Sequence, residues 1–257
     1  MLSIQPIEAF SDNYIWLISR ESDKQAFVVD PGDPDVVEQV LSARGLSLAG
    51  ILITHHHFDH VGGLTALKAA HNPVVYGPDN PAIEGIDHTV GAGDSVDVLG
   101  ETFAVLEVPG HTLDHIAYVA GGDKPSLFCG DTLFAGGCGR LFEGTPQMMH
   151  KSLQALMELP GNTSVYCAHE YTLANLEFAR AVEPGNAELI KRIADAQASR
   201  ARGEPTVPSN IALEQATNPF VRCDTKELQA SLEAQHKLGD TEADAVFALV
   251  RGWKDNF

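Results

Sequence analysis

The stretch GILITHHHFDH, residues 50–60, joins a short apolar run to a cluster of histidines. The run GILIT (50–54) has the length and the β-branched composition of a buried strand. Four of the chain's 11 histidines follow within six residues. Imidazoles crowded on one loop repel one another when protonated, and a bound cation removes that cost. The pattern therefore predicts a metal site at the end of a strand.

The spacing within this loop favours two metal ions. His55 and His57 flank His56, so an extended backbone projects them to one side and turns His56 away. Asp59 and His60 follow where the chain enters the next helix. Histidine and aspartate together suit borderline divalent metals such as zinc, manganese or iron. One loop is thus expected to supply ligands to two adjacent ions, each of which needs further ligands from elsewhere.

Three other predicted strands end at a ligand-type residue. These residues are His111 in PGHTLDH (109–115), Asp131 in CGDTLF (129–134) and His169 in CAHEYT (167–172). Active sites commonly collect on the loops that follow strands, so we expect these side chains to converge with the histidine loop. His115 is expected to orient a ligand from behind. Cys129 and Cys167, among apolar neighbours, are expected to be buried packing residues.

Strands and helices are intermixed over the first two thirds of the chain, which indicates an α/β sandwich. Further strands are predicted at 15–18, 26–30, 72–77, 102–108, 115–120, 126–130 and 164–168, and helices near 34–45, 61–71 and 146–158. After residue 172 the pattern becomes helical, at 172–202, 224–237 and 240–252, with 209–220 as a connecting loop. We therefore predict a metal-binding domain over 1–172 and a small α-helical domain over 173–257.

Charge excludes some functions. The 257 residues contain 17 Lys and Arg against 35 Asp and Glu, a net charge of −18. Nucleic-acid binding requires a basic face, so neither a nucleic-acid partner nor a nuclease activity is expected. Only 5 basic residues lie within 1–139, whereas 140–257 contains 12, so cations able to hold an anionic ligand are concentrated in the second part.

The same composition bears on location and assembly. The N-terminal stretch lacks the pattern of a signal peptide, and no apolar run approaches the ~20 residues that cross a bilayer, so no membrane partner is expected. The four cysteines form no C-x-x-C pair and fit reduced thiols, which favours a cytoplasmic protein. A monomer is expected.

At its ligand residues the sequence resembles the metallo-β-lactamase superfamily, through H-x-H-x-D-H and the later His, Asp and His. Within that superfamily it is similar to the glyoxalase II, or hydroxyacylglutathione hydrolase, family. The similarity includes the stretches DNYIW (12–16), VDPGD (29–33), THHHFDHVGG (54–63), PGHT (109–112), CGDTLF (129–134), GCGRLFEGT (137–145), AHEYT (168–172), TNPF (217–220) and RGWKDNF (251–257).

The resemblance implies an αββα sandwich followed by a helical C-terminal domain that binds glutathione. It implies one metal ion held by His55, His57 and His111, a second held by Asp59, His60 and His169, and Asp131 bridging the two. The ions are expected to be zinc, with iron or manganese as alternatives. It implies a glutathione site that includes Arg140, Phe142, Tyr171, Arg251 and Lys254. Phe142 replaces the Tyr of some relatives, and Asp114 stands where many carry Gly.

The implied reaction is hydrolysis of S-D-lactoylglutathione, or of related S-2-hydroxyacylglutathiones, to D-lactate and glutathione, the second step of methylglyoxal detoxification. A hydroxide shared by the two metals is the expected nucleophile, with Asp59 and Asp131 as the catalytic carboxylates. Two alternatives remain open at this point. One is a glutathione persulfide dioxygenase, and the other is a hydrolase of the same fold that acts on lactones or β-lactams.

Overall fold

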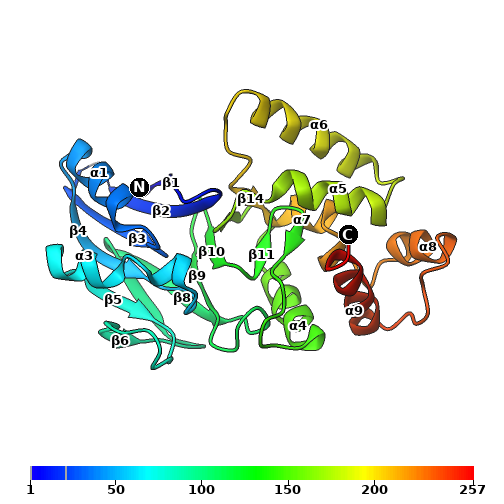
Figure 1. Ribbon diagram of the computed structural model, residues 1–257, viewed down its shortest axis with the longest axis horizontal. Coiled ribbons are helices and arrows are strands. Elements are labelled where there is room, and N and C mark those ends of the chain that lie inside the picture. The colour runs from blue at the N-terminus through cyan, green and yellow to red at the C-terminus, as the bar shows by residue number, and fades with distance from the viewer. Residues whose placement is uncertain (1, 21) are drawn as a thin grey trace. The chain divides into compact units, whose positions relative to one another are not determined.

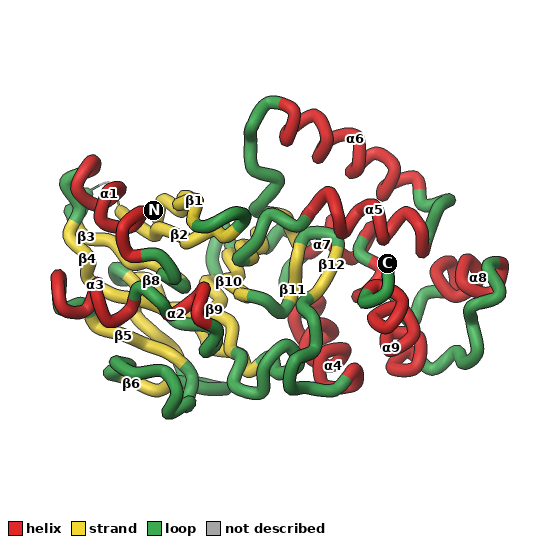
Figure 2. Tube along the Cα trace, viewed as in Figure 1, coloured by secondary structure: helices red, strands yellow, loops and turns green. Residues whose placement is uncertain are grey.

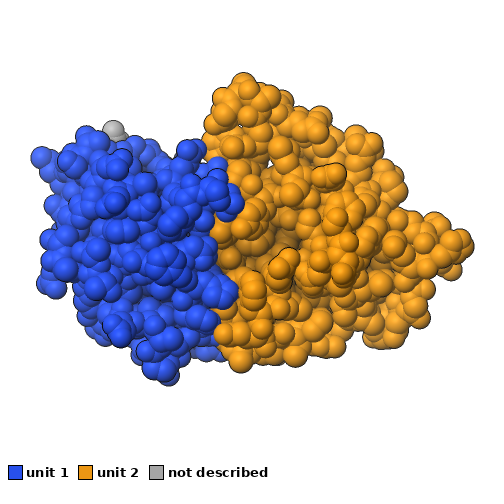
Figure 3. Space-filling model, in the orientation of Figure 1, with its two compact units in different colours: residues 1–108, 114–130 blue, residues 109–113, 131–257 orange. Residues whose placement is uncertain are grey.

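The computed structural model describes residues 2–20 and 22–257, and the chain divides into two compact units. Unit 1 consists of residues 1–108 and 114–130, and unit 2 consists of residues 109–113 and 131–257 (Figure 3). Unit 1 contains the long strands, whereas unit 2 is mainly helical (Figures 1 and 2). Each unit is described separately below.

The first sheet of unit 1 has six strands in the order of the chain. They are β1 (Leu2–Ala9), β2 (Asn13–Arg20), β3 (Gln25–Val29), β4 (Ser47–Leu52), β5 (Val74–Gly77) and β6 (His88–Thr89). The first three pair antiparallel and the rest pair parallel. Parallel neighbours need a crossover, and helices α1 (Pro34–Arg44) and α3 (Leu64–His71) supply two of them. The β4 strand, which leads to the histidine loop, lies within the sheet.

Both crossover helices pack on this sheet through a common core. Val37 and Leu41 of α1 and Leu64 and Leu67 of α3 are buried with the apolar residues of the first five strands. Burying one such aliphatic side chain contributes ~1.5–3 kcal/mol. The Asp33 side chain accepts a hydrogen bond from the Asp35 amide and so begins α1. The sequence pattern and the caps therefore act together to fix where the crossovers start and end.

The remaining strands of unit 1 lie against the first sheet. They are β7 (Ser95–Val98), β8 (Glu101–Glu107), β9 (Ile116–Ala120) and β10 (Ser126–Gly130), which pair antiparallel in the order β10-β9-β8-β7. The buried Tyr118 hydroxyl of β9 donates to the Ile53 carbonyl at 2.9 Å. The Ile116 amide donates to the Thr54 carbonyl, also at 2.9 Å. These bonds fix the backbone at the point where the histidine loop begins.

Unit 2 is built mainly from helices. They are α4 (Pro146–Met157), α5 (Thr172–Val182), α6 (Ala187–Ala201), α7 (Ile211–Thr217), α8 (Lys226–Ala234) and α9 (Ala243–Lys254), with a 3-10 turn, η1, at Pro219–Val221. Two short ribbons accompany them: β11 (Leu133–Phe134) with β12 (Gly137–Cys138), and β13 (Ser164–Cys167) with β14 (Ser209–Asn210). Asn or Thr side chains begin α4, α6, α7 and α8.

The predicted mixed α/β fold followed by C-terminal helices is confirmed, and a strand is found at every predicted position. The predicted loop at 209–220 is wrong, because it contains β14, α7 and η1. Asn210 caps α7 by accepting from the Leu213 amide, and the buried Ile211 anchors the helix. The predicted helix over 172–202 is two helices, since the chain breaks at 183–186 around Pro184 and Gly185. The domain boundary at residue 172 stays a prediction.

No helix in the described residues has both the length and the apolar character needed to cross a membrane.

Candidate metal site

The histidine loop of unit 1 is anchored by Asp30, at the end of β3. Its Oδ1 accepts from the Thr54 amide at 2.8 Å, and its Oδ2 accepts from the Thr54 hydroxyl at 2.7 Å. Oδ2 also lies 3.0 Å from His60 Nδ1. Because a carboxylate accepts, Nδ1 carries the proton and Nε2 of a neutral His60 carries the lone pair that a metal ligand needs. Asp30 therefore fixes the loop backbone at Thr54 and the tautomer of His60.

The predicted ligands of this loop come together in two pairs. His55 Nε2 and His57 Nδ1 are 3.1 Å apart, and His60 Nε2 lies 3.3 Å from Asp59 Oδ2. The Asn13 amide donates to the same Asp59 oxygen at 2.9 Å. His55 and His60 are buried, whereas their partners His57 and Asp59 are partly exposed, so each pair lies at the boundary between the interior and solvent. The pairing follows the sequence spacing, with one pair from the extended part of the loop and one from the short helix α2 (Phe58–Val61).

Glycines allow the loop to fold this tightly. A Cβ atom on Gly32 would lie 1.9 Å from the Asp59 carbonyl oxygen. One on Gly62 would lie 2.7 Å from the Gly32 oxygen, and one on Gly63 would lie 2.4 Å from the Pro31 oxygen. The turn after β3 and the start of α3 therefore touch backbone to backbone beside the predicted ligands.

The neighbouring histidines have other contacts. His56 Nδ1 lies 3.0 Å from Asp114 Oδ1, and the other Asp114 oxygen accepts from Asn80 at 2.8 Å. Asp114 thus orients the His56 ring. This contact gives a role to Asp114, which stands where many relatives carry Gly. The buried His115 ring stacks on His55, with ring centres 4.5 Å apart, so it contacts a predicted ligand.

The predicted ligands of unit 2 gather around one carboxylate. Asp131 Oδ2 lies 3.5 Å from His111 Nε2, and Asp131 Oδ1 lies 3.4 Å from His169 Nε2. Each oxygen therefore faces a different imidazole, which is compatible with the bridging role that the resemblance implies for Asp131. His111 Nδ1 donates to the Arg140 carbonyl at 2.7 Å, so its Nε2 is the nitrogen left to act as the predicted ligand. A Cβ atom on Gly139 would lie 2.0 Å from the Asp131 carbonyl oxygen.

The donor chemistry of both units fits divalent metal ions. Each unit presents imidazole nitrogens next to carboxylate oxygens, with at least one ring in each fixed by a hydrogen bond on its other nitrogen. The cysteines behave differently. Burial raises the pKa of the Cys167 thiol to about 12, and Cys129 is fully buried, as expected of packing residues. The ligand set is therefore one of histidine and aspartate.

The predicted substrate-binding cations of unit 2 are linked by Asp255. The Arg251 guanidinium is buried, donates to Asp255 at 2.9 Å and to the Cys138 carbonyl at 3.2 Å, and lies over the Phe220 ring. The exposed Arg140 has its Nε 3.8 Å from the same Asp255 oxygen. Two of the predicted cations thus share one carboxylate, which the sequence interpretation did not include.

The other predicted substrate residues lie on nearby elements of unit 2. Lys254 donates to the Ala174 carbonyl at 3.1 Å, and desolvation is the main cause that lowers the pKa of its ammonium group. Tyr171 stacks on His169 with ring centres 4.6 Å apart. Phe142 is 62% exposed and meets the His111 ring edge-on at 5.2 Å. Both aromatic rings therefore touch a predicted metal ligand.

The sequence did not lead us to predict three residues that support the site: Asn13, Asp30 and Asp255. Each lies in a stretch that carries the family resemblance, namely DNYIW, VDPGD and RGWKDNF. The signal was therefore present, but no spacing rule connects these residues to the site residues that they contact.

Comparisons with known proteins match the whole chain. Residues 10–169 match the family model described as metallo-beta-lactamase superfamily, and residues 170–257 match the one described as hydroxyacylglutathione hydrolase C-terminus. The chain is 51% identical to the hydroxyacylglutathione hydrolase of Chromohalobacter salexigens and 50% identical to that of Pseudomonas aeruginosa, with both chains fully covered in each case.

Solved structures show the same fold. The ETHE1 structure from Myxococcus xanthus is 27% identical, with a TM-score of 0.66 and 99% coverage of both chains. The BLEG-1 B3 metallo-beta-lactamase is 22% identical with a TM-score of 0.64, covers 86% of this chain, is itself 99% covered, and shows the fold alone. Identity of about one half over the full length is decisive: the chain belongs to the hydroxyacylglutathione hydrolase family of the metallo-β-lactamase superfamily.

Proposed function

We propose that this protein hydrolyses S-D-lactoylglutathione and related S-2-hydroxyacylglutathiones to the free hydroxy acid and glutathione. The observation that carries the proposal is the match of residues 170–257 to the hydroxyacylglutathione hydrolase C-terminus, beside full-length relatives of that name. The same segment contains Arg251 and Lys254, the cations expected to bind the glutathione carboxylates. Neither the persulfide dioxygenase nor the lactone and β-lactam alternatives is favoured by this match.

We further propose that two divalent ions, zinc first with iron or manganese as alternatives, bind the predicted ligands. His55, His57 and His111 hold one ion, and Asp59, His60 and His169 hold the other, with Asp131 between them. Bound divalent ions lower the pKa of water to about 7 and stabilise the charge that develops on a carbonyl oxygen. The support within each unit is the paired donors of the histidine loop and the two imidazoles that face Asp131.

The protein's own groups have distinct roles in this reaction. Asp59, which accepts a hydrogen bond from Asn13, would also accept one from the attacking water and so orient it. Arg140, Arg251 and Lys254 bind the glutathione carboxylates, and Phe142 and Tyr171 pack beside the peptide. The leaving group is a thiolate with a pKa near ~8.5, so expulsion requires little help from a general acid. The chain thus needs to position water and substrate more than it needs to move protons.

We expect the enzyme to work as a monomer in the cytoplasm. All four cysteines lie in described residues and none is in a disulfide, which fits a reducing compartment. The net charge of −18 opposes binding to nucleic acid or to anionic lipid.

The direct test follows the loss of the thioester in S-D-lactoylglutathione with purified protein. Samples treated with a chelator, and then supplied again with zinc, iron or manganese, show whether turnover depends on metal. We expect turnover that disappears on chelation and returns with metal. No turnover by protein that contains two metal equivalents would refute the substrate assignment. Oxygen consumption with glutathione persulfide, or hydrolysis of a lactone or β-lactam, would then identify one of the alternatives.

A further inference from the structure

The ribbon β11–β12 of unit 2 connects two groups of site residues. Asp131 precedes the ribbon and Arg140 follows it, and the Cys138 carbonyl within it accepts from Arg251. The Phe134 ring meets the His169 ring edge-on, with centres 5.8 Å apart. A displacement of this ribbon therefore moves a predicted metal ligand and predicted substrate contacts together.

The ribbon has little stability of its own. Each strand has two residues, and only Leu133 with Cys138 and Phe134 with Gly137 are paired. Isolated two-stranded ribbons are marginal even when they are longer, because few bonds offset the entropy of ordering the backbone. Its position must therefore be set by contacts from elsewhere in unit 2.

Those contacts come from the TNPF stretch and the helix before it. The side-chain Nδ2 of Asn218 donates to the Gly137 carbonyl at 2.8 Å and to the Phe134 carbonyl at 3.3 Å. The Glu214 carboxylate accepts from the Gly136 amide at 2.9 Å and from Asn218 at 3.0 Å. Asn218 and Glu214 thus hold the backbone on both sides of the ribbon's turn.

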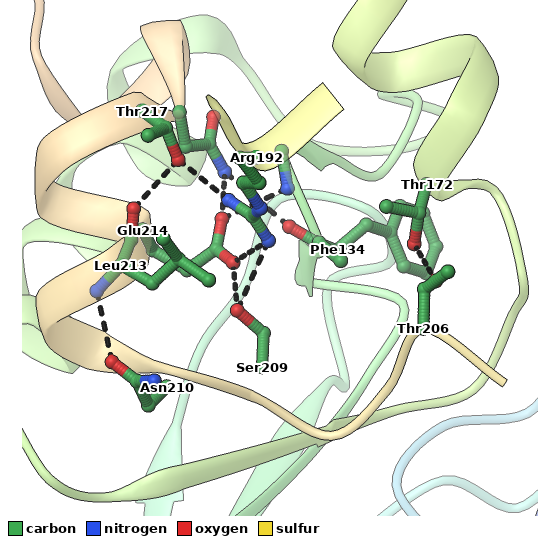
Figure 4. A network of polar contacts seen from close by, with 12 residues as sticks. Phe134, Thr172, Arg192, Thr206, Ser209, Asn210, Leu213, Glu214 and Thr217 are labelled. Atoms are coloured by element: carbon green, nitrogen blue, oxygen red, sulfur yellow. Dashed lines mark hydrogen bonds and ion pairs between the residues drawn. The ribbon is translucent and has the colours of Figure 1, made fainter. Parts of the chain in front are cut away.

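Glu214 is itself held within a buried network (Figure 4). It is fully buried and pairs with the Arg192 guanidinium at 2.5 Å, and it also accepts from Ser209. Arg192 donates to Thr217 at 2.6 Å as well. A buried charge without partners is strongly unfavourable, so this network keeps the Glu214 carboxylate at one position. The ribbon is thereby tied to α6 and α7, two elements that supply none of the predicted ligands.

We propose that Asn218 and Glu214 are positioning residues for the metal site: they hold the β11–β12 ribbon so that Asp131 stays between His111 and His169. They contact neither metal nor substrate and act through the backbone of the ribbon. The proposal rests on the proposed function for the role of Asp131 as a metal ligand. Its test therefore measures metal binding in the absence of substrate.

The test uses two asparagines with matching contacts. The Oδ1 atoms of Asn218 and Asn186 each accept from a backbone amide at 3.1 Å and cap a helical segment. Each side chain also donates to a carbonyl, which for Asn186 is that of Ala216 at 3.0 Å. Serine is a good cap but is too short to reach those carbonyls. Asn218→Ser therefore releases the ribbon, whereas Asn186→Ser makes a similar change at a side chain that donates to α7 and not to the ribbon.

Metal affinity is measured for both variants by competition with a chelator, and melting temperature is measured in parallel. We expect Asn218→Ser to weaken metal binding by about tenfold or more, the range seen when groups behind metal ligands are removed. Asn186→Ser is expected to leave the affinity within about twofold of the parent, since it leaves the ligands in place. Both are expected to lower the melting temperature by about 2–4 °C.

Equal metal affinities for the two variants, with similar losses of melting temperature, would overturn the proposal, because Asn218 would then be a structural residue only. If Asn218→Ser does not fold, Glu214→Gln replaces it, because glutamine keeps the size of the side chain but loses one of the two carboxylate oxygens that accept from the Gly136 amide and from Arg192. Its metal affinity should fall in the same direction. An unchanged affinity in that variant would equally contradict the proposal. Failure to hydrolyse the thioester affects neither measurement, so the two proposals fail separately.

Discussion

The histidine loop of unit 1 and the region of the β11–β12 ribbon in unit 2 hold predicted metal ligands in place by different means. The loop carries four predicted ligands within residues 55–60, directly after β4. Unit 2 takes its three predicted ligands from 111, 131 and 169, on separate segments. Adjacent ligands are therefore arranged mainly by local backbone geometry, whereas dispersed ligands depend on how distant elements are packed.

The supports of the two regions differ in the same way. Asp30 holds the loop from the neighbouring strand β3 through bonds to Thr54 and His60. The ribbon is held by Glu214 and Asn218, which are 78 to 84 residues away along the chain. Substitutions of a ligand, of a supporting residue and of a substrate contact therefore test whether the two regions depend on different supports.

The largest effect is expected from removing the carboxylate that the ribbon positions. Asp131→Ala leaves His111 and His169 without the carboxylate between them, so metal content should fall. Because the loss of a group that only supports a ligand costs up to about 100-fold, the loss of a ligand should lower kcat by more than that. Metal analysis and steady-state kinetics measure the two effects. Asp87→Ala, which removes a carboxylate paired with Lys68 at the surface, is the control and should change neither. An Asp131→Ala protein with full metal content and normal kcat would contradict the assignment.

A large loss of stability is expected when the ribbon's support is broken. Glu214→Ala leaves the Arg192 guanidinium buried without its carboxylate, which should cost about 3–5 kcal/mol of unfolding free energy. Urea denaturation measures this. Glu204→Ala, which removes a fully exposed pair with Arg202, should leave the midpoint unchanged because solvent screens that pair. Equal midpoints for the two variants would mean that the buried network does not stabilise unit 2.

A smaller effect is expected on the loop side. Asp30→Asn keeps the size of the side chain but removes the charge that holds the Nδ1 proton of His60. Metal affinity should fall by about 10–100-fold, as is typical when a group that orients a ligand is changed. Chelator competition measures it, with Asp33→Asn as the control, since asparagine caps α1 as well as aspartate does. An unchanged affinity for Asp30→Asn would mean that the loop holds its geometry without this anchor.

The smallest effect is expected at the predicted glutathione contacts. Lys254→Met should raise KM about fivefold and leave kcat unchanged, because it removes ~1 kcal/mol of binding shared by ground and transition states. Steady-state kinetics with the thioester measure it. Lys237→Met, which removes a lysine that lies over the Trp253 ring, should leave both constants unchanged. A fall in kcat for Lys254→Met would assign this lysine a role beyond substrate binding.

The secondary structure predicted from sequence was most accurate where one physical signal dominated. The β-branched runs all lie in strands because their apolar residues are buried in the sheets. The stretch 209–220 was wrongly predicted as a loop because Pro205 and Pro208 before it, and the polar residues within it, weakened the helical signal. Tertiary contacts decide that region, where the buried Ile211 and the paired Glu214 stabilise α7.

The sequence by itself determined the family, the mixed α/β fold and the candidate ligands, because strand ends, histidine spacing and long shared motifs are local properties of the chain. Only the tertiary structure revealed that Asp30 fixes the tautomer of His60, that Asp114 turns His56 and that Asp255 joins Arg140 to Arg251. It also gave the TNPF stretch a contact with the ribbon that follows Asp131. Side chains so far apart in sequence meet through packing of whole elements, and no local spacing encodes that packing.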